Sequence, residues 1–327
     1  MDIKDQVLRM LEDDRTAWHS GEEMANRLGV SRAAVWKAIK GLRDGGHSIE
    51  SGKNRGYRLG PDDDMLSSAG IEKHLGTSAR NVRLEVFDTI TSTNDRAREH
   101  AAAGEPEGCV VVAGQQTAGR GRFGRPFYSP SDSGLYLSLL TRPSLDADEA
   151  WLITPAAAVA VVEAVEQVTG RDAGIKWVND VYLDGRKICG ILTEAAVSME
   201  AGSIDYAVVG IGINVYEPEG GFPPAIADRA GAIAAVHEAE LRNRIAAAVI
   251  TSFMSYYPHL RQRRFVESYR AHSIVSGRNL VVVKGDRRVP AFVLGVDDDL
   301  RLHVRYEDGS EEFLHSGEVS IDLESRG

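Results

Sequence analysis

The sequence predicts an α+β protein of three domains, at residues 1–62, 66–270 and 271–327. Three observations carry this prediction. Apolar residues recur at helical spacing near the N-terminus, apolar strands mix with helices through the middle, and short strands separated by turns fill the C-terminal end. A length of 327 residues suits two or three domains, and 43% hydrophobic with 26% charged residues is typical of a globular protein.

Charge is distributed unevenly along the chain. The formal net charge is −10, yet residues 31–58 hold seven lysines and arginines against Asp44 and Glu50, a local net of +5. The rest of the chain therefore carries −15, which is −10 minus +5. This pattern excludes a chain that binds nucleic acid over its whole surface and indicates one module that faces it.

The basic segment coincides with a helix-turn-helix pattern. Ser20 can cap one helix and Ser31 the next, with the turn at residues 28–31 between them. Residues 47–59 then alternate like a β-hairpin with a basic tip, so residues 3–60 resemble a winged helix-turn-helix domain. The alternative is a small packing domain with solvated lysines. The residues expected to contact DNA are Ser31, Arg32, Lys37, Lys40, Lys53 and Arg55. Residues 61–64 are the expected linker.

A glycine–arginine loop follows a buried strand in the middle of the chain. Strands are expected at residues 82–87, 109–113, 135–140, 188–194 and 206–211, and a buried helix runs from Pro155 to Gly170, capped by Thr154. Residues 114–125 then combine four glycines with three arginines. Open backbone N–H groups and forked cationic side chains predict an anion site, although a flexible basic surface loop is the alternative. The spacing is neither the dinucleotide nor the P-loop pattern.

Four other segments gain meaning from their order. They are Ser-Thr-Asn at 92–94, Lys-Trp-Val-Asn-Asp at 176–180, Arg-Lys-Ile-Cys-Gly-Ile-Leu at 186–192 and Gly-Ile-Gly-Ile-Asn at 210–214. Alone, each has a plain explanation: a helix cap, a turn, a solvated lysine, and a strand that another group approaches closely. Together with the loop they resemble the biotin protein ligases, and with the winged helix they resemble the bifunctional biotin ligase and biotin-operon repressors. The chain departs from that pattern at Val178, usually proline, and at Phe123, often basic.

The resemblance implies a central class II synthetase-like fold and a two-step reaction that joins biotin to a carrier-protein lysine through biotinyl-5′-AMP. The catalytic residues would be Lys187, Arg122 and Asp180. Biotin would be bound by Ser92, Thr93, Asn94, Gln116, Arg120, Gly121, Arg122 and Lys187. ATP would be bound by Arg120, Arg122, Lys176, Asn179, Lys187 and Asn214, with Mg²⁺ held mainly by the nucleotide oxygens.

The C-terminal end predicts a small β-barrel. Strands are expected at residues 279–283, 291–296, 300–306 and 311–314, with turns at 285–286, 297–299 and 308–309. This arrangement resembles the SH3-like domain of the same family.

The implied partners are a biotin carboxyl carrier protein, operator DNA and a second copy of the chain when the adenylate is bound. Cys109 and Cys189 lie in apolar segments, and no signal peptide is apparent, which favours the cytoplasm. The most apolar stretch, residues 151–162, is expected to be too short to span a membrane. Three alternatives stay open: a ligase whose winged helix does not regulate, a ligand-sensing transcription factor without catalysis, and a relative that transfers lipoyl or octanoyl groups.

Overall fold

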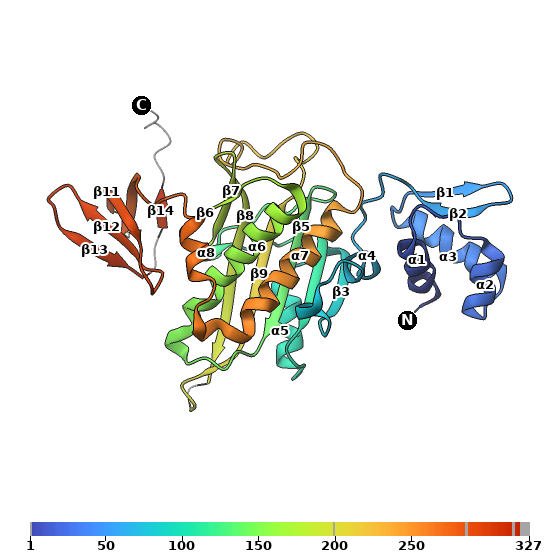
Figure 1. Cartoon of the computed structure of the whole chain (residues 1–327), viewed down its shortest axis with the longest axis horizontal. Coiled ribbons are helices and arrows are strands. Elements are labelled where there is room, and N and C mark those ends of the chain that lie inside the picture. The colour runs from blue at the N-terminus through green and yellow to red at the C-terminus, as the bar shows by residue number, and fades with distance from the viewer. Residues whose placement is uncertain (1, 199, 285–286, 316–317, 321–327) are drawn as a thin grey trace.

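The structure is a computed structural model that describes residues 2–198, 200–284, 287–315 and 318–320. A helical N-terminal unit and a C-terminal sheet lie at opposite ends of a larger central unit (Figure 1). This is the expected α+β architecture, and it contains the predicted strands together with helices and short strands that the sequence pattern did not predict.

The N-terminal unit is a winged helix, as predicted. It contains α1 (Ile3–Asp13), α2 (Gly21–Leu28), α3 (Arg32–Asp44) and the hairpin of β1 (Ile49–Gly52) and β2 (Gly56–Leu59). Ser20 and Ser31 accept hydrogen bonds from Glu22 N and Ala34 N, so both predicted caps form. Its apolar side chains form a core separate from that of the rest of the protein.

The expected linker is tightly anchored. Pro61 and Asp62 are exposed, but Asp63 and Asp64 are both buried where the chain enters α4 (Ser68–Glu72). Asp64 is held by Arg242 and by the Tyr216 hydroxyl. The expected linker is therefore a fixed connection between the two units, although a run of aspartates is usually exposed to solvent.

The central unit is built on one mixed sheet of seven strands in the order β3-β4-β5-β9-β8-β7-β6. The β3–β4 pair is parallel and the other neighbouring pairs are antiparallel. All five predicted strands are present: β3 (Arg83–Ile90), β4 (Cys109–Gln116), β5 (Gly134–Thr141), β8 (Arg186–Val197) and β9 (Ile204–Asn214). The Lys-Trp-Val-Asn-Asp segment turns between two further short strands, β6 (Gly174–Lys176) and β7 (Asp180–Leu183).

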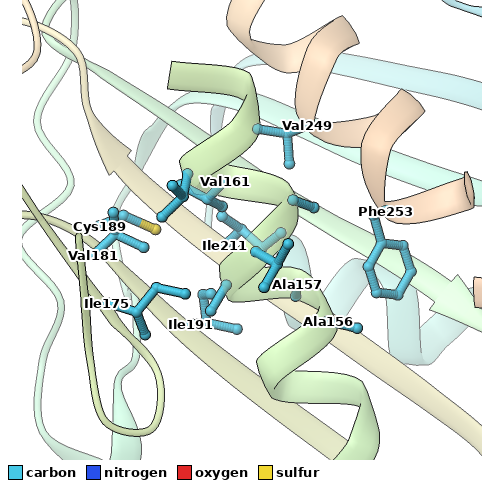
Figure 2. Close-up of a cluster of buried hydrophobic side chains, with 14 of the residues drawn as sticks. Ala156, Ala157, Val161, Ile175, Val181, Cys189, Ile191, Ile211, Val249 and Phe253 are labelled. Atoms are coloured by element: carbon cyan, nitrogen blue, oxygen red, sulfur yellow. The ribbon is translucent and has the colours of Figure 1, made fainter. Parts of the chain in front are cut away.

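Helices cover both faces of this sheet. On one face α6 (Ile153–Thr169) packs between the strands and α7 (Leu241–Tyr256), with Val161, Ile191, Ile211 and Phe253 in the core between them (Figure 2). On the other face α5 (Thr93–Ala102) buries Ala97 and Ala101 against β4, β5 and β9. The remaining helical segments are η1 (Thr77–Ala79), η2 (Arg122–Gly124), η3 (Ala147–Leu152), η4 (Tyr257–Gln262) and α8 (Val266–Ala271).

Two predictions about α6 are wrong in detail. Thr154 does not cap the helix, because η3 runs directly into it and Leu152 is the cap residue; the Thr154 hydroxyl instead donates to Thr193 Oγ1 at 2.8 Å. Residues 147–169 are also long and apolar enough to cross a membrane by length and composition, contrary to expectation. The burial of α6 against the sheet and α7 accounts for this apolar character.

The C-terminal unit is an antiparallel sheet in the order β13-β12-β11-β10-β14, as expected of an SH3-like domain. Its strands are β10 (Asn279–Lys284), β11 (Arg287–Val296), β12 (Leu302–Tyr306), β13 (Glu311–Leu314) and β14 (Glu318–Ser320). The first four match the predicted strands, and β14 is an addition that pairs with β10. The predicted turn at 285–286 lies outside the described residues.

Candidate ligand-binding and DNA-binding sites

A cavity of about 300 Å³ lies where α5, the glycine–arginine loop and the strands β6 to β9 meet. Every residue predicted to bind biotin or ATP, or to act in catalysis, lines this cavity. They are Ser92, Thr93, Asn94, Gln116, Arg120, Gly121, Arg122, Lys176, Asn179, Asp180, Lys187 and Asn214. The fold thus brings together five segments that are spread over more than a hundred residues of sequence.

The start of α5 forms one wall of the cavity. Ser92 caps the helix, as its plain explanation predicts, accepting from Asp95 N at 3.4 Å. Thr93 donates from its backbone N to Gln116 Oε1 at 2.8 Å, while Gln116 Nε2 donates to Ser129 Oγ at 3.2 Å. The cap therefore holds this polar wall in place, so structural and binding roles coexist in the same residues.

Asn94 is fixed by two side chains that the sequence pattern did not single out. The Ser138 hydroxyl donates to its Oδ1 at 2.6 Å, and Glu194 Oε2 accepts from its Nδ2 at 2.7 Å. Gly210 makes room for this amide, because a Cβ there would lie 2.1 Å from Asn94 Oδ1. The close approach predicted for this glycine strand is thus made by a side chain of the protein itself.

Phe127 is a cavity residue that sequence reasoning missed. Its ring lies over β8 and β9, where a Cβ on Gly212 would come within 2.4 Å of it and one on Gly190 within 3.1 Å. The ring also meets Tyr136 edge to face, with centroids 6.4 Å apart. Phe127 therefore adds an apolar surface to a cavity that α5 lines with polar groups. The Gly-x-Gly spacing was the available signal, since it requires a bulky partner above the strand.

The arginines of the glycine–arginine loop contact different parts of the central unit. Arg120 pairs with Asp95 on α5, and Arg122 donates to Asn179 Oδ1 at 3.0 Å. Although partial burial opposes it, the Arg120 and Arg98 guanidinium groups hold the pKa of Asp95 below its usual range. Phe123 has a φ of 58° and is 71% exposed, with the guanidinium groups of Arg122 and Arg125 beside its ring.

The opposite wall carries a lysine–aspartate pair. Lys187, near the start of β8, donates to Asp180 Oδ1 at 2.6 Å. Lys176 lies 5.8 Å from the ring centroid of Tyr182, another cavity residue. The Trp177–Val178 peptide bond is cis, at the position where the family usually has proline. The Val178 departure thus leaves the neighbouring Asn179 and Asp180 in the cavity lining.

A segment that follows β9 closes the last side. Asn214 Nδ2 donates to the Gly231 carbonyl at 3.0 Å, and Lys187 N donates to the Arg229 carbonyl at 2.7 Å. Phe222, Ile226 and Arg229 from this segment line the cavity, although no motif marked them. Asn214 therefore lies beside a covering segment rather than on an open strand.

Cationic side chains outnumber carboxylates in the lining of the cavity. Six cationic residues face one carboxylate, that of Asp180, among the described residues that line it. The cations are Arg120, Arg122, Arg125, Lys176, Lys187 and Arg229. This excess suits a ligand with more than one negative group. In the described part of the chain, no group of three or more His, Cys, Asp or Glu side chains could hold a metal ion.

The predicted DNA-contacting residues lie on one unit. Arg32, Lys37 and Lys40 are exposed on α3, and Ser31 caps that helix. Lys53 and Arg55 are exposed at the tip between β1 and β2, as expected of a wing. The Arg55 and Arg58 guanidinium groups lie over the Trp18 ring, at 4.4 and 4.8 Å from its centroid, which ties the wing to the helical part.

Comparisons with known proteins agree with this geometry. Residues 86–214 match the biotin/lipoate A/B protein ligase family, and residues 4–58 match an HTH domain. A bifunctional ligase/repressor BirA from Bacillus subtilis is 30% identical over 323 residues, which cover 98% of each chain. A biotin–[acetyl-CoA-carboxylase] ligase from Mycobacterium tuberculosis is 32% identical over 237 residues, or 70% of this chain and 85% of that protein.

Among solved structures, a biotin protein ligase from Aquifex aeolicus in complex with biotin and ATP matches with a TM-score of 0.59 and 26% identity. The match covers 73% of this chain and 98% of that one. Since the Bacillus relative aligns over nearly the full length of both proteins, the chain belongs to the BirA family of bifunctional ligase/repressors.

Proposed function

We propose that the protein attaches biotin to a lysine of a biotin carboxyl carrier protein at the expense of ATP, and that it represses biotin genes in response to biotin. The convergence of twelve motif residues on one cation-rich cavity carries the catalytic half of this proposal. A full-length relative named as both ligase and repressor supports the combination of the two activities.

The first step brings two anions together. An oxygen of the biotin carboxylate forms a bond to the α-phosphorus of ATP, and the bond from that phosphorus to the bridging oxygen breaks, so that pyrophosphate leaves with the electron pair. Arg120, Arg122 and Lys187 would offset the repulsion between carboxylate and phosphate and stabilise the charge that develops. Their positions around one cavity support this assignment.

The second step transfers the acyl group. The amine of the carrier lysine forms a bond to the acyl carbon of biotinyl-5′-AMP, the carbon–oxygen bond to phosphate breaks, and AMP leaves. Asp180 would orient that amine and accept its proton. In the free protein the Asp180 carboxylate accepts from Lys187 Nζ at 2.6 Å. Asp180 would exchange this partner for the lysine of the carrier in the second step.

The two substrates would occupy different walls. Ser92, Thr93, Asn94 and Gln116 supply donors and acceptors for the neutral ureido ring of biotin, and the loop at Gly121 would close over the ligand and keep water from the anhydride. Lys176, Asn179 and Asn214 would contact the nucleotide. Mg²⁺ would be held mainly by ATP oxygens and water, which this ion prefers as ligands.

The repressor half rests on the winged helix. Ser31, Arg32, Lys37, Lys40, Lys53 and Arg55 would contact operator DNA, with Lys53 and Arg55 on phosphate or in the minor groove. The adenylate would be the corepressor, because ordering of the loops around it would favour a homodimer that matches a palindromic operator. We also propose the three-domain division at residues 62–66 and 270–271 and a cytoplasmic location, supported by the separate N-terminal core and by two buried free cysteines.

Transfer of biotin to a carrier domain tests the ligase. The full chain is incubated with ATP, Mg²⁺, biotin and a biotin carboxyl carrier domain, and the carrier is probed with streptavidin. We expect ATP-dependent labelling of one lysine. An unlabelled carrier would leave a ligand-sensing transcription factor, and labelling by lipoate or octanoate in its place would indicate the lipoyl-transferring relative.

An Arg122→Ala variant tests the assigned loop residue. Adenylate formation should slow by about 100-fold to 1000-fold, the usual cost of removing one group that stabilises transition-state charge. Adenylate retention on a desalting column and single-turnover rates measure this. Arg278→Ala, an exposed arginine of the C-terminal unit, is the matched control. Equal rates in the two variants would remove Arg122 from the catalytic machinery.

Footprinting on candidate promoters tests repression. Protection should strengthen when biotin and ATP are both present, and the protein should sediment as a dimer under the same conditions. A protein that biotinylates its carrier but protects no promoter would be a ligase with a non-regulatory winged helix.

A further inference from the structure

Trp36 is a large aromatic side chain that α3 leaves in solvent. Its side chain is 58% exposed. The other large apolar side chains of α3, those of Val35, Ile39 and Leu42, are buried with Ala38 in the N-terminal core. Trp36 therefore takes no part in that core, and its ring lies on the outer face of the helix.

The outer face is otherwise cationic. Arg32 and Lys40 lie one helical turn before and after Trp36 and share its face, and both are exposed. The Lys40 ammonium is 5.9 Å from the Trp36 ring centroid, within cation–π range. A single exposed aromatic residue is unremarkable, but one set inside a stripe of cations on a segment of net charge +5 lies on a surface that complements duplex DNA.

The chemistry of the major groove selects a partner for the ring. Cations suit phosphates and guanine, whereas an aromatic face needs an apolar group, and the C5-methyl of thymine is the apolar group that base edges present there. Base contacts of a recognition helix come mainly from its N-terminal part, and Trp36 is the fifth residue of the 13-residue α3.

We propose that Trp36 reads a thymine methyl group in the major groove of the operator and is a specificity-determining residue for DNA, an inference that rests on the proposed operator binding. Arg32 and Lys40 would contact the flanking phosphates or bases and hold the helix in register. The operator should therefore hold, in each half-site, one thymine whose methyl group matters to binding.

A coupling experiment between the ring and the methyl group tests this. Duplexes are first selected from a randomised library with the full chain, biotin and ATP, and each thymine of the selected sequence is then replaced singly by deoxyuridine, which removes only the methyl. In the unaltered protein, one position per half-site should weaken binding about fourfold, as expected for one buried methyl-sized group.

Variants of Trp36 test whether this side chain contacts the methyl group. In Trp36→Ala the fourfold effect at that position should vanish, and in Trp36→Phe, which keeps an apolar ring without the indole N–H, it should persist. Lys53→Ala is the matched control. Loss of this wing cation should weaken the binding of all duplexes by the same factor and leave the effect of the thymine methyl group intact. Hydrogen exchange of α1 to α3 verifies that the winged helix of each variant is folded, because that unit has its own core, and biotin transfer to the carrier domain verifies the central unit.

Three results would overturn the inference. One is that no thymine position depends on Trp36, and another is that both ring variants bind as the unaltered protein does. The third is that Trp36→Ala changes only the dimerisation of the protein and not its base preference. If the library yields no preferred duplex at all, the proposed operator binding is wrong, and the inference about Trp36, which rests on it, is wrong too.

Discussion

The two ends of the central unit hold their neighbours by different chemistry. At the N-terminal end the winged helix keeps its own apolar core, and buried charges make the joint: Arg242 meets Asp64, and Glu12 lies beneath Arg15 and Lys73. At the C-terminal end the apolar core continues from the central sheet into β10, β11 and β12. Two ion pairs across that boundary, Arg263 with Asp299 and Arg270 with Asp298, lie at the surface.

Because of this difference, substitutions at the two joints should lower the free energy of unfolding in different ways. A buried ion pair depends on each partner, because removal of one leaves the other charged, dry and uncompensated. An apolar joint depends on the area that it buries and tolerates the loss of surface charges. The unit proposed to bind DNA is thus held by a few buried charges, each of which is needed, and the C-terminal sheet is held by apolar packing.

Removal of the Asp64 carboxylate should have the largest effect. The Asp64 carboxylate accepts from Arg242 Nε at 3.0 Å, and both side chains are almost fully buried. We expect Asp64→Ala to lower the free energy of unfolding by about 3–5 kcal/mol, measured by denaturant titration. Asp298→Ala, which breaks an exposed pair with Arg270, is the matched control and should cost almost nothing. Similar losses in the two variants would erase the distinction between the joints.

Loss of one buried hydrogen bond should weaken the C-terminal joint by less. Trp177 Nε1 donates to the Leu300 carbonyl at 2.8 Å, across the boundary between the central and C-terminal units. Trp177→Phe keeps an apolar ring but leaves that carbonyl without its donor and a small void beside it, and should cost about 1–3 kcal/mol. Hydrogen exchange of β12 and denaturant titration would report it. If the variant matched the unaltered protein, packing alone would account for this joint.

Acid should affect the N-terminal joint through Glu240. Burial opposes ionisation, but hydrogen bonds from Lys73 and His74 hold the pKa of Glu240 below its usual value of 4.5. A carboxyl group with a lowered pKa stabilises the fold above its unfolded pKa, and this contribution is lost as the pH falls through the folded pKa. Glu240→Gln should therefore cost on the order of 1 kcal/mol at pH 7 and progressively less below about pH 4.5.

The measurement for Glu240 is unfolding free energy against pH in both proteins. Glu267→Gln, at an exposed position on α8, is the control and should not alter the shape of the curve. A constant difference between Glu240→Gln and the unaltered protein across pH would contradict the ionic origin of this contribution.

Salt should have the smallest effect and should separate the two joints once more. In about 1 M salt the Debye length falls to roughly 3 Å, so exposed pairs are screened while buried pairs are not. The small cost of Asp298→Ala should disappear, and the cost of Asp64→Ala should remain. Titrations at low and high salt measure both, and a salt-sensitive Asp64 effect would mean that water reaches this pair.

Local patterns in the sequence predicted most of the candidate site. The Ser-Thr-Asn and Lys-Trp-Val-Asn-Asp segments keep their polar groups at the ends of strands and helices, so their spacing along the chain already marks them. No local pattern indicated Ser138 or Glu194, and the Gly-x-Gly spacing indicated a bulky partner above its strand without identifying Phe127. Each is positioned by a partner from another strand or helix, and no local pattern encodes that partner.

The sequence by itself determined the winged helix, the strands of the central sheet, the glycine–arginine loop and the family, because periodicity, caps and motif order are written in neighbouring residues. Tertiary structure alone decided that Asp63 and Asp64 would be buried and that the Gly210 and Gly212 positions would be filled by Asn94 and Phe127. It also decided that, among the described residues, six cations and a single carboxylate would line the cavity. Burial and electrostatic potential depend on which distant segments meet, and only the folded chain settles that.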